Sequence, residues 1–389
     1  MDDFEKIGEA MPDDMEPLYV QIYRELLNDI KSGKYDKNQK LPTEKELSEQ
    51  FFVSRITSKK AMNMLAKENV IIRIKGKGSY VSPHLCENIS DEPDTVKRKA
   101  IGVIFSDVSE SYGQEVFMTI EKCCREHEML CVFFRSEGDQ EIEHQAVEYM
   151  IEHGVAGIII MPVHGAYYNA AVLRLVLDGF PIVVVDRDLR GMPSHFVGTD
   201  NVAAAKDAMD FLINAGHRKI GIYSPNMFKT SSLEDRMEGT LQSIEYHNIP
   251  ITQGLFFTQI YSTMPGNQMP DAFEKDCQVI MEHIQANPGI TAALAMEYQI
   301  ALMIKNAAQR LGLRVPEDIS IMCFDSPKKG HKASEKSDFE FTHIRQKEKE
   351  IGKGAFDLLM SLIQGELYAE AVKIMLSFSV EAGPSTQLL

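Results

Sequence analysis

The chain has 389 residues, of which 44% are apolar, and a formal net charge of −16 at pH 7. This length allows two or three domains of about 100–200 residues each. The composition argues against a membrane protein, because no apolar stretch of about 18 residues occurs, and the acidic N-terminus does not have the pattern of a signal peptide. We therefore expect a cytoplasmic protein.

Positive charge is concentrated in one segment of this acidic chain. Between Lys34 and Lys77, eleven lysines and arginines outnumber five acidic residues, so the segment has a balance of +6. The phosphates of nucleic acids attract such charge, whereas the acidic remainder would repel them. The segment is thus the part of the chain that we expect to bind DNA.

The first domain is predicted to span residues 17–82, after an acidic leader at residues 1–16. Apolar residues at helical spacing predict a helix that begins at Pro17 and ends at Gly33. A polar loop follows and separates this helix from the rest of the domain.

Two further helices and a hairpin follow the loop. Thr43 and Glu46 have the spacing of a capping box, which predicts a second, short helix. Ser54 can cap a third helix that extends to about Asn69. Residues 70–81 alternate and then turn at a glycine-lysine sequence, which predicts a two-stranded hairpin. Helix, turn, helix and basic wing are therefore contiguous.

The third helix is the element that would enter the major groove, where its N-terminal side chains reach base edges. Arg55 could bind O6 and N7 of guanine with two hydrogen bonds, and Lys59 would lie on the same side one turn later. The alternative is an ordinary solvated basic face of a helix. The candidate DNA-binding residues are Lys45, Ser54, Arg55, Thr57, Ser58, Lys59, Lys60, Lys77 and Gly78.

This region closely resembles the GntR family of winged-helix regulators. The matching segments are 41–47, 53–62 and 76–81, which read LPTEKEL, VSRITSKKAM and GKGSYV. They match the family signature in order and spacing. The resemblance implies that the domain binds double-stranded operator DNA.

The chain departs from the family pattern at two kinds of position. Lys45 and Lys59 stand where the family usually has arginines, so a point charge replaces a two-pronged contact. Phe52 occupies a turn position that is commonly glycine, where a left-handed backbone would be costly for a bulky residue. We therefore expect a slightly different turn.

Residues 83–99 are polar and acidic with two prolines, which is typical of a linker. From residue 100 to residue 389, short apolar segments alternate with amphipathic helical stretches. Strands that are buried on both faces and separated by helices form parallel sheets, so we expect a doubly wound α/β domain. The predicted strands begin at Ala100, Met129, Val155, Pro181, Lys219, Ala292 and Ser320.

A doubly wound sheet binds its ligands at the carboxyl ends of the strands. Acids, arginines and an aromatic ring at these ends suit a polyhydroxylated small molecule, because charged groups bind hydroxyls strongly and a ring covers an apolar sugar face. Any one of these residues could instead cap a helix or face solvent. The candidate effector-binding residues are Ser106, Asp107, Tyr112, Arg135, His164, Arg187, Arg236, Glu297, Tyr298 and Asp325.

The sequence gives no sign of catalysis. It contains no GxGxxG, Walker lysine loop, GxSxG elbow or HExxH motif, and its six cysteines have no zinc-site spacing. We predict no catalytic residue, no metal and no cofactor.

The second region resembles the effector domain of the LacI/GalR family, itself similar to periplasmic sugar-binding proteins, across about residues 99 to 385. Landmarks include Pro181–Arg187, Gly198–Asn201 and Gly216–Ile220. The resemblance implies two lobes. The first would comprise about residues 100–198 and 344–370, and the second about residues 199–343 and 371–389.

The same resemblance places Tyr112 against a sugar ring and Arg187, Arg236 and Asp325 at effector contacts. Where the family commonly has Asn-Asp after the sixth strand, this chain has Glu297-Tyr298. The sequence therefore predicts an altered pocket and does not identify the sugar.

A GntR-like reader joined to a LacI-like sensor resembles the arabinose-responsive repressors of Gram-positive bacteria. The combination implies a homodimeric repressor of carbohydrate-utilisation genes, which a small sugar, a monosaccharide or derivative, releases from a pseudo-palindromic operator. Two alternatives stay open: a co-repressor-dependent regulator with a non-sugar ligand, and a sugar- or nucleotide-processing enzyme.

Overall fold

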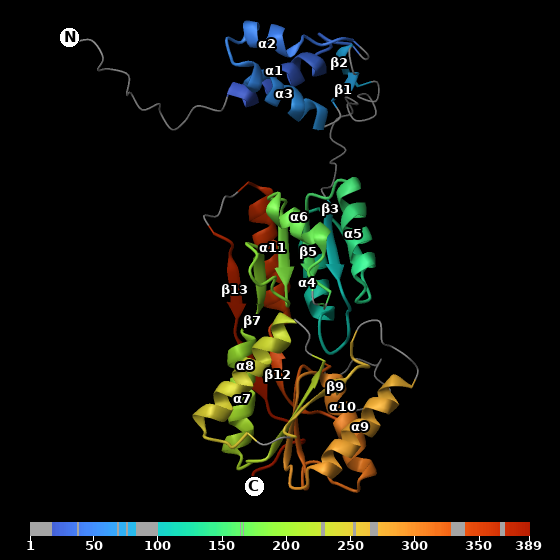
Figure 1. Ribbon diagram of the computed structural model, residues 1–389, viewed down its shortest axis with the longest axis vertical. Coiled ribbons are helices and arrows are strands. Elements are labelled where there is room, and N and C mark those ends of the chain that lie inside the picture. Colours follow the sequence, from blue (N-terminus) through green and yellow to red (C-terminus); the bar gives the residue numbers. More distant parts are fainter. Residues whose placement is uncertain are drawn as a thin grey trace, which may run out of the picture. The chain divides into compact units, whose positions relative to one another are not determined.

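The computed structural model (Figure 1) divides the chain into two compact units, Met1–Lys97 and Arg98–Leu389. The structure describes residues 18–36, 39–67, 70–74, 77–82, 100–163, 165, 167–226, 230–251, 254–264, 271–327, 339–365 and 370–389. The expected leader and linker lie outside the described residues.

The first unit consists of three helices and a hairpin, as expected. Apolar side chains from every element meet in one core, which includes the fully buried Leu47, Leu65 and Val81. The elements are α1 (Leu18–Lys31), α2 (Glu44–Gln50), α3 (Arg55–Lys67), β1 (Ile71–Ile74) and β2 (Gly78–Val81).

The capping box predicted for the second helix is confirmed. The side chain of Thr43 accepts a hydrogen bond from the backbone N–H of Glu46, and the carboxylate of Glu46 accepts one from the backbone N–H of Thr43 at 2.7 Å. The hairpin also gains a third extended segment, because Leu41 N–H donates to the carbonyl of Ser79 and Val81 N–H donates to the carbonyl of Gln39, both at 2.9 Å. The loop before α2 therefore supports the wing.

The larger unit has two lobes, and the sheet of the first lobe is parallel throughout. Its strand order is β13-β7-β6-β5-β3-β4. Alternate residues of the strands pack on α4 and α11 on one face and on α5 and α6 on the other. These elements are β3 (Ala100–Phe105), α4 (Gln114–Glu126), β4 (Leu130–Arg135), α5 (Gln140–Glu152), β5 (Gly157–Met161), α6 (Ala170–Leu177), β6 (Ile182–Val185), β7 (His195–Thr199), α11 (Glu348–Ile363) and β13 (Lys373–Leu376).

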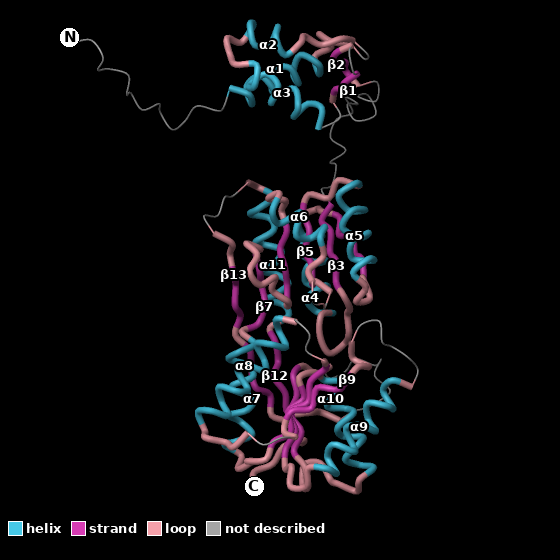
Figure 2. The backbone as a smooth tube through the Cα atoms, viewed as in Figure 1, coloured by secondary structure: helices cyan, strands magenta, loops and turns pink. Residues whose placement is uncertain are grey.

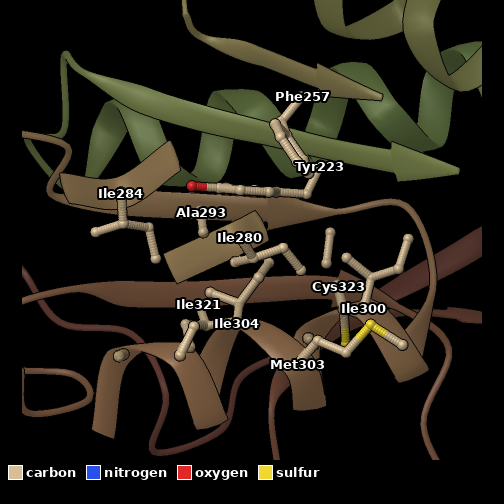
Figure 3. Close-up of a cluster of buried hydrophobic side chains, with 14 of the residues drawn as sticks. Tyr223, Phe257, Ile280, Ile284, Ala293, Ile300, Met303, Ile304, Ile321 and Cys323 are labelled. Atoms are coloured by element: carbon tan, nitrogen blue, oxygen red, sulfur yellow. The ribbon is translucent and has the colours of Figure 1, made fainter. Parts of the chain in front are cut away.

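The second lobe repeats this plan, with α7 and α8 on one side of the strands and α9 and α10 on the other (Figure 2). Its strand order is β14-β12-β11-β10-β8-β9, and only β14 is antiparallel to its neighbour. Figure 3 shows Ala293 and Ile321 of the sheet facing Ile280 of α9 and Ile304 of α10. The elements are α7 (Asn201–Asn214), β8 (Ile220–Pro225), α8 (Ser231–Tyr246), β9 (Phe256–Ile260), α9 (Ala272–Ala286), β10 (Ala292–Ala295), α10 (Tyr298–Arg310), β11 (Ser320–Phe324), β12 (Thr342–Gln346) and β14 (Phe378–Glu381).

The chain passes between the lobes after β7, after β12 and after β13. The last two crossings differ from the expectation, because β12 pairs wholly within the second lobe and β13 pairs with β7 in the first. The final crossing thus follows Leu376 rather than residue 370. Two contacts join the crossings: Asp200 N–H donates to the carbonyl of Leu376 at 3.0 Å, and Lys347 Nζ donates to Ser377 Oγ at 2.7 Å.

Within the described ranges, no helix is long and apolar enough to cross a lipid bilayer. The same ranges contain no group of three or more His, Cys, Asp or Glu side chains that could hold a metal ion.

Candidate functional site

The exposed end of α3 carries two of the predicted DNA contacts. Arg55 is the first residue of α3, and Lys59 follows one turn later; both are exposed and form no ion pair within the described part of the chain. Lys45 on α2 is also exposed, and only a long 3.8 Å ion pair links its Nζ to Glu49. These three cations are free to meet phosphates or bases.

Ser54 and Ser58 serve the fold of this unit. Ser54 Oγ accepts a hydrogen bond from the N–H of Thr57 and lies 2.8 Å from the Thr57 hydroxyl, so it caps α3. Ser58 is fully buried, and its hydroxyl lies 2.7 Å from the carbonyl of Glu44. The prediction that Ser58 contacts DNA is therefore wrong, because its hydroxyl is buried and hydrogen-bonds α3 to the first residue of α2.

Lys60 and the wing residues occupy different surfaces. The ammonium of Lys60 stands 3.7 Å from the ring centroid of Tyr19 on α1, a cation–π contact between the two helices. Lys77 is exposed. Gly78 has a φ of 113°, a backbone conformation that other residues rarely adopt, so the wing favours glycine at this position.

The second site is a cavity of about 580 Å³ between the two lobes of the larger unit. It lies at the carboxyl ends of the strands, where a doubly wound sheet binds ligands. Seven of the ten predicted effector residues line it: Asp107, Tyr112, Arg187, Arg236, Glu297, Tyr298 and Asp325.

The remaining three predicted residues do not line the cavity. Ser106 is buried behind it and accepts a hydrogen bond from Arg187 Nη1 at 2.7 Å, so it orients that arginine. Arg135 is exposed and does not line the cavity as predicted; it pairs with Glu137 at 2.5 Å and lies 3.8 Å from Asp107, which does line it. His164 lies outside the described residues.

The two arginines of the cavity are fixed by buried acceptors. Arg187 donates to Ser106 and to the carbonyl of Pro162 at 2.8 Å, and its Nε lies 3.4 Å from Asp186. Arg236 donates from Nε to Asn201 Oδ1 at 2.8 Å and from Nη1 to the carbonyl of Met296 at 2.6 Å. These contacts hold both guanidinium groups ready for a ligand before it arrives.

Two of the four carboxyl groups of the cavity, those of Asp325 and Glu297, are poorly solvated. Burial raises the pKa of Asp325 to about 7; Asp186 and Glu348 add to the rise, and Arg236 and a hydrogen bond from Gln346 Nε2 at 2.9 Å oppose it. Burial also raises the pKa of Glu297. Such groups gain from new hydrogen-bond donors, because nearby water does not solvate them fully.

Tyr112 has an unused polar atom in this cavity. Its hydroxyl is buried near Asp186 but has no partner at good hydrogen-bonding geometry among the described residues, and burial raises its pKa well above the ordinary value. A buried hydroxyl in this state costs free energy unless a ligand or water binds it.

Sequence reasoning missed several lining residues. Asp186 follows a predicted strand directly, but this position alone did not distinguish it from a helix cap, and its φ of 65° is known only from the structure. Ser262 and Thr263 were missed because the strand before them, β9, was not predicted. The further lining residues are Ser109, Ser111, Met161, Ser232, Leu233, Ala272, Phe273, Gln299 and Met303.

The arrangement suits a neutral molecule with several hydroxyls. The described lining contains four carboxyl groups and two guanidinium groups, together with three aromatic rings. Even with Asp325 protonated, it has no excess of positive charge. It therefore offers acceptors and donors for hydroxyls and rings for apolar sugar faces, but its two arginines are outnumbered by carboxyl groups that would repel a phosphate.

Two protein families match the chain in separate segments. Residues 101–367 match the family described as periplasmic binding protein domain, and residues 18–81 match the bacterial regulatory proteins of the gntR family. An arabinose metabolism transcriptional repressor of Geobacillus stearothermophilus is 27% identical over 90% of this chain and 92% of that protein. A repressor of the same name from Halalkalibacterium halodurans is 24% identical over 90% of this chain and 91% of its own length.

Solved structures resemble the larger unit in fold. A LacI family transcriptional regulator from Enterococcus faecium, solved with bound ribose, has a TM-score of 0.61 and 22% identity over 75% of this chain and all of that one. The transcription regulator CcpA of Lactococcus lactis has a TM-score of 0.63 and 21% identity over the same shares.

Proposed function

This chain belongs to the periplasmic binding protein domain family and carries a gntR-family DNA-binding domain, and from that premise we propose that a neutral monosaccharide releases it from its operator. It is a DNA-binding transcriptional regulator and not an enzyme. We propose that it acts in the cytoplasm as a homodimer and represses genes of carbohydrate utilisation.

The composition of the cavity is the observation that carries this proposal. Asp186, Asp325 and Glu297 can accept hydrogen bonds from hydroxyls, while Arg187 and Arg236 donate to ring and hydroxyl oxygens. An anionic sugar would bring its charge beside these carboxylates. Since two relatives are named as repressors of arabinose metabolism, a pentose is the first effector to test.

Release from DNA requires that the sugar bind one arrangement of the lobes better than another. The cavity is lined by both lobes, so a ligand that touches both favours their closure. Typical coupling between two such sites is about 1–3 kcal/mol. Closure would alter the dimer contact and thereby the separation of the two α3 helices, which must match half-sites about 34–36 Å apart or a multiple.

An apolar surface at the edge of the first lobe supports the dimer proposal. β4 is an edge strand on which Leu130 and Phe133 are exposed, and Met118 of the neighbouring α4 is 58% exposed. The Phe133 ring packs on Phe117 with centroids 4.5 Å apart. An exposed apolar edge strand favours association with a second chain, and a two-fold dimer would pair this surface with itself.

The double change Met118→Asp and Leu130→Asp tests the dimer. We expect light scattering to give the mass of a monomer, and operator affinity to fall by at least about 100-fold because one half-site contact is lost. Leu177→Asp on α6 is the matched control, since Leu177 is 68% exposed and belongs to a helix that packs on α5. A double variant that remains a dimer would contradict this surface.

Arg55→Ala tests the proposed reading of bases by α3. We expect it to lose about 1–3 kcal/mol of discrimination between operator and random DNA, because two hydrogen bonds to guanine disappear. Arg55→Lys keeps the positive charge but loses the guanidinium group that can donate two parallel hydrogen bonds. This variant should therefore bind random DNA normally and still lose selectivity. Unchanged selectivity in a competition mobility-shift assay would refute the assignment.

The effector is identified by a thermal-shift screen of neutral pentoses, hexoses and their phosphates. A true effector at 100 times its dissociation constant should stabilise the protein by about 2.7 kcal/mol. The same sugar should then weaken binding to the gene's own upstream DNA in a mobility-shift assay. Stabilisation by phosphate esters alone would contradict the neutral-sugar proposal, and tighter DNA binding with the sugar would contradict release.

A further inference from the structure

Phe52 has a backbone conformation that is unfavourable for its side chain. It follows α2 and has a φ of 52°, in the left-handed region, so the expectation of a different turn is wrong. The end of α2 requires this, because Phe51 N–H donates to the carbonyl of Leu47 and Val53 N–H donates to that of Ser48. Of the other non-glycine residues with positive φ in the described ranges, three are Asp or Asn, types that tolerate it better, and two are Glu.

Core packing does not offset this strain. Phe52 is 94% exposed, whereas Phe51 and Val53 on either side of it pack against the core of the unit. A glycine would relieve the backbone, and a polar residue would suit the solvent. Phe52 therefore breaks two local rules without any compensating contact in the described part of its unit, which points to a role in a complex.

The surroundings of Phe52 indicate which partner it meets. Arg55 begins α3 three residues later, so the two Cα atoms lie within about 11 Å of each other. Lys45 and Lys59 are exposed on the flanking helices. An exposed apolar ring three residues before the first residue of the reading helix suits the apolar group that the major groove presents, the 5-methyl group of thymine.

We propose that Phe52 is a specificity-determining residue, whose ring packs on a thymine methyl next to the base bound by Arg55. This inference rests on the DNA-binding function of α3. It assigns to the turn a preference for thymine that glycine could not supply. In the complex, this contact would offset the free energy that the left-handed phenylalanine costs in the free protein.

Phe52→Gly separates this role from a structural one. We expect the melting temperature of the DNA-binding unit in the full chain to rise by about 4 °C as strain is relieved. We expect operator affinity to fall about tenfold, the scale of burying one aromatic ring. Phe52→Asn, which tolerates the left-handed backbone but is polar, should lose the same affinity, and Phe52→Leu should retain most of it.

The methyl group is tested by preparing the upstream DNA fragment with deoxyuridine in place of thymidine. The wild-type chain should lose about tenfold in affinity, and Phe52→Gly should lose little further, because the partner of the methyl is already gone. Equal losses in both chains, or normal operator affinity of Phe52→Gly, would overturn the proposal. If Phe52→Gly, measured without DNA, no longer had the mass of a dimer, the ring would instead belong to a contact between two copies of the chain, and the proposal would be overturned. Failure of the wild-type chain to bind the unmodified fragment would count against the regulator function itself.

Discussion

Replacing Arg236 by alanine is expected to remove the response to the effector while operator binding persists. Arg236 lines the cavity from α8, and its Nε donates to Asn201 at the first crossing between the lobes. It also stands 4.0 Å over the ring of Phe324. A ligand that binds this guanidinium therefore engages a group already attached to the segment that must move when the lobes close.

We expect the affinity for the effector to fall by at least about 100-fold, since charge-assisted hydrogen bonds contribute about 1.5–3 kcal/mol each and Arg236 can supply two. The protein should also lose about 1–3 kcal/mol of stability, because the buried oxygens of Asn201 and Met296 lose their donor. Calorimetric titration with the sugar and a mobility-shift assay measure the two functions separately.

Arg314→Ala is the matched control for this change. Arg314 is exposed and pairs with Asp318, outside the lining of the cavity. It should leave both functions unchanged. An Arg236→Ala protein that still releases DNA at the same sugar concentration would show that the effector does not depend on this arginine.

Much of the fold could be predicted because its central strands are unusual in composition. The segments that became β3, β5, β6, β10 and β11 are short, apolar and buried on both faces, which is a pattern that few other structures produce. The strands that were missed are different. β7, β12 and β14 mix polar and apolar residues. β13 and β14 are edge strands, so solvent can reach their outer edges and their side chains need not be apolar throughout.

The site could be predicted only in part because a cavity is defined by packing between distant segments. Strand ends gave Asp107, Arg187 and Asp325, since parallel strands bring their carboxyl ends together. They also gave Arg135, which the edge position of β4 directs to solvent and to Glu137. Ser58 was misassigned for a related reason: its place on α3 suggested DNA, but the contact with Glu44 depends on how α2 crosses that helix.

The expected result with the clearest dependence on pH comes from Asp325→Asn. The pKa of Asp325 lies at about 7 in the folded protein, against 3.8 for an ordinary aspartate. A raised pKa means that the folded state prefers the protonated form of Asp325. The contribution of this group to the free energy of unfolding is therefore fully present below about pH 4 and declines as pH rises toward 7. Asparagine does not titrate and removes this decline.

We therefore expect Asp325→Asn to unfold at a higher temperature than the wild-type chain at pH 8 and at a similar temperature at pH 4. The gain at pH 8 should be about 2 kcal/mol, because cleft water reduces the full linkage value. Affinity for a neutral sugar should change in the opposite direction at pH 8, by about tenfold or more, since a carboxylate accepts hydroxyl hydrogen bonds more strongly than an amide.

Asp318→Asn is the matched control for the pH dependence. A hydrogen bond from Arg314 lowers the pKa of Asp318 to about 2, so this carboxylate stays charged throughout the range from pH 4 to pH 8. Its replacement should shift the melting temperature by the same amount at both ends of the range. If Asp325→Asn behaved in this way too, Asp325 would have to be ionised and well solvated in the folded state. Its carboxylate would then already be satisfied by water, and the argument that it waits for the hydroxyls of a sugar would fail.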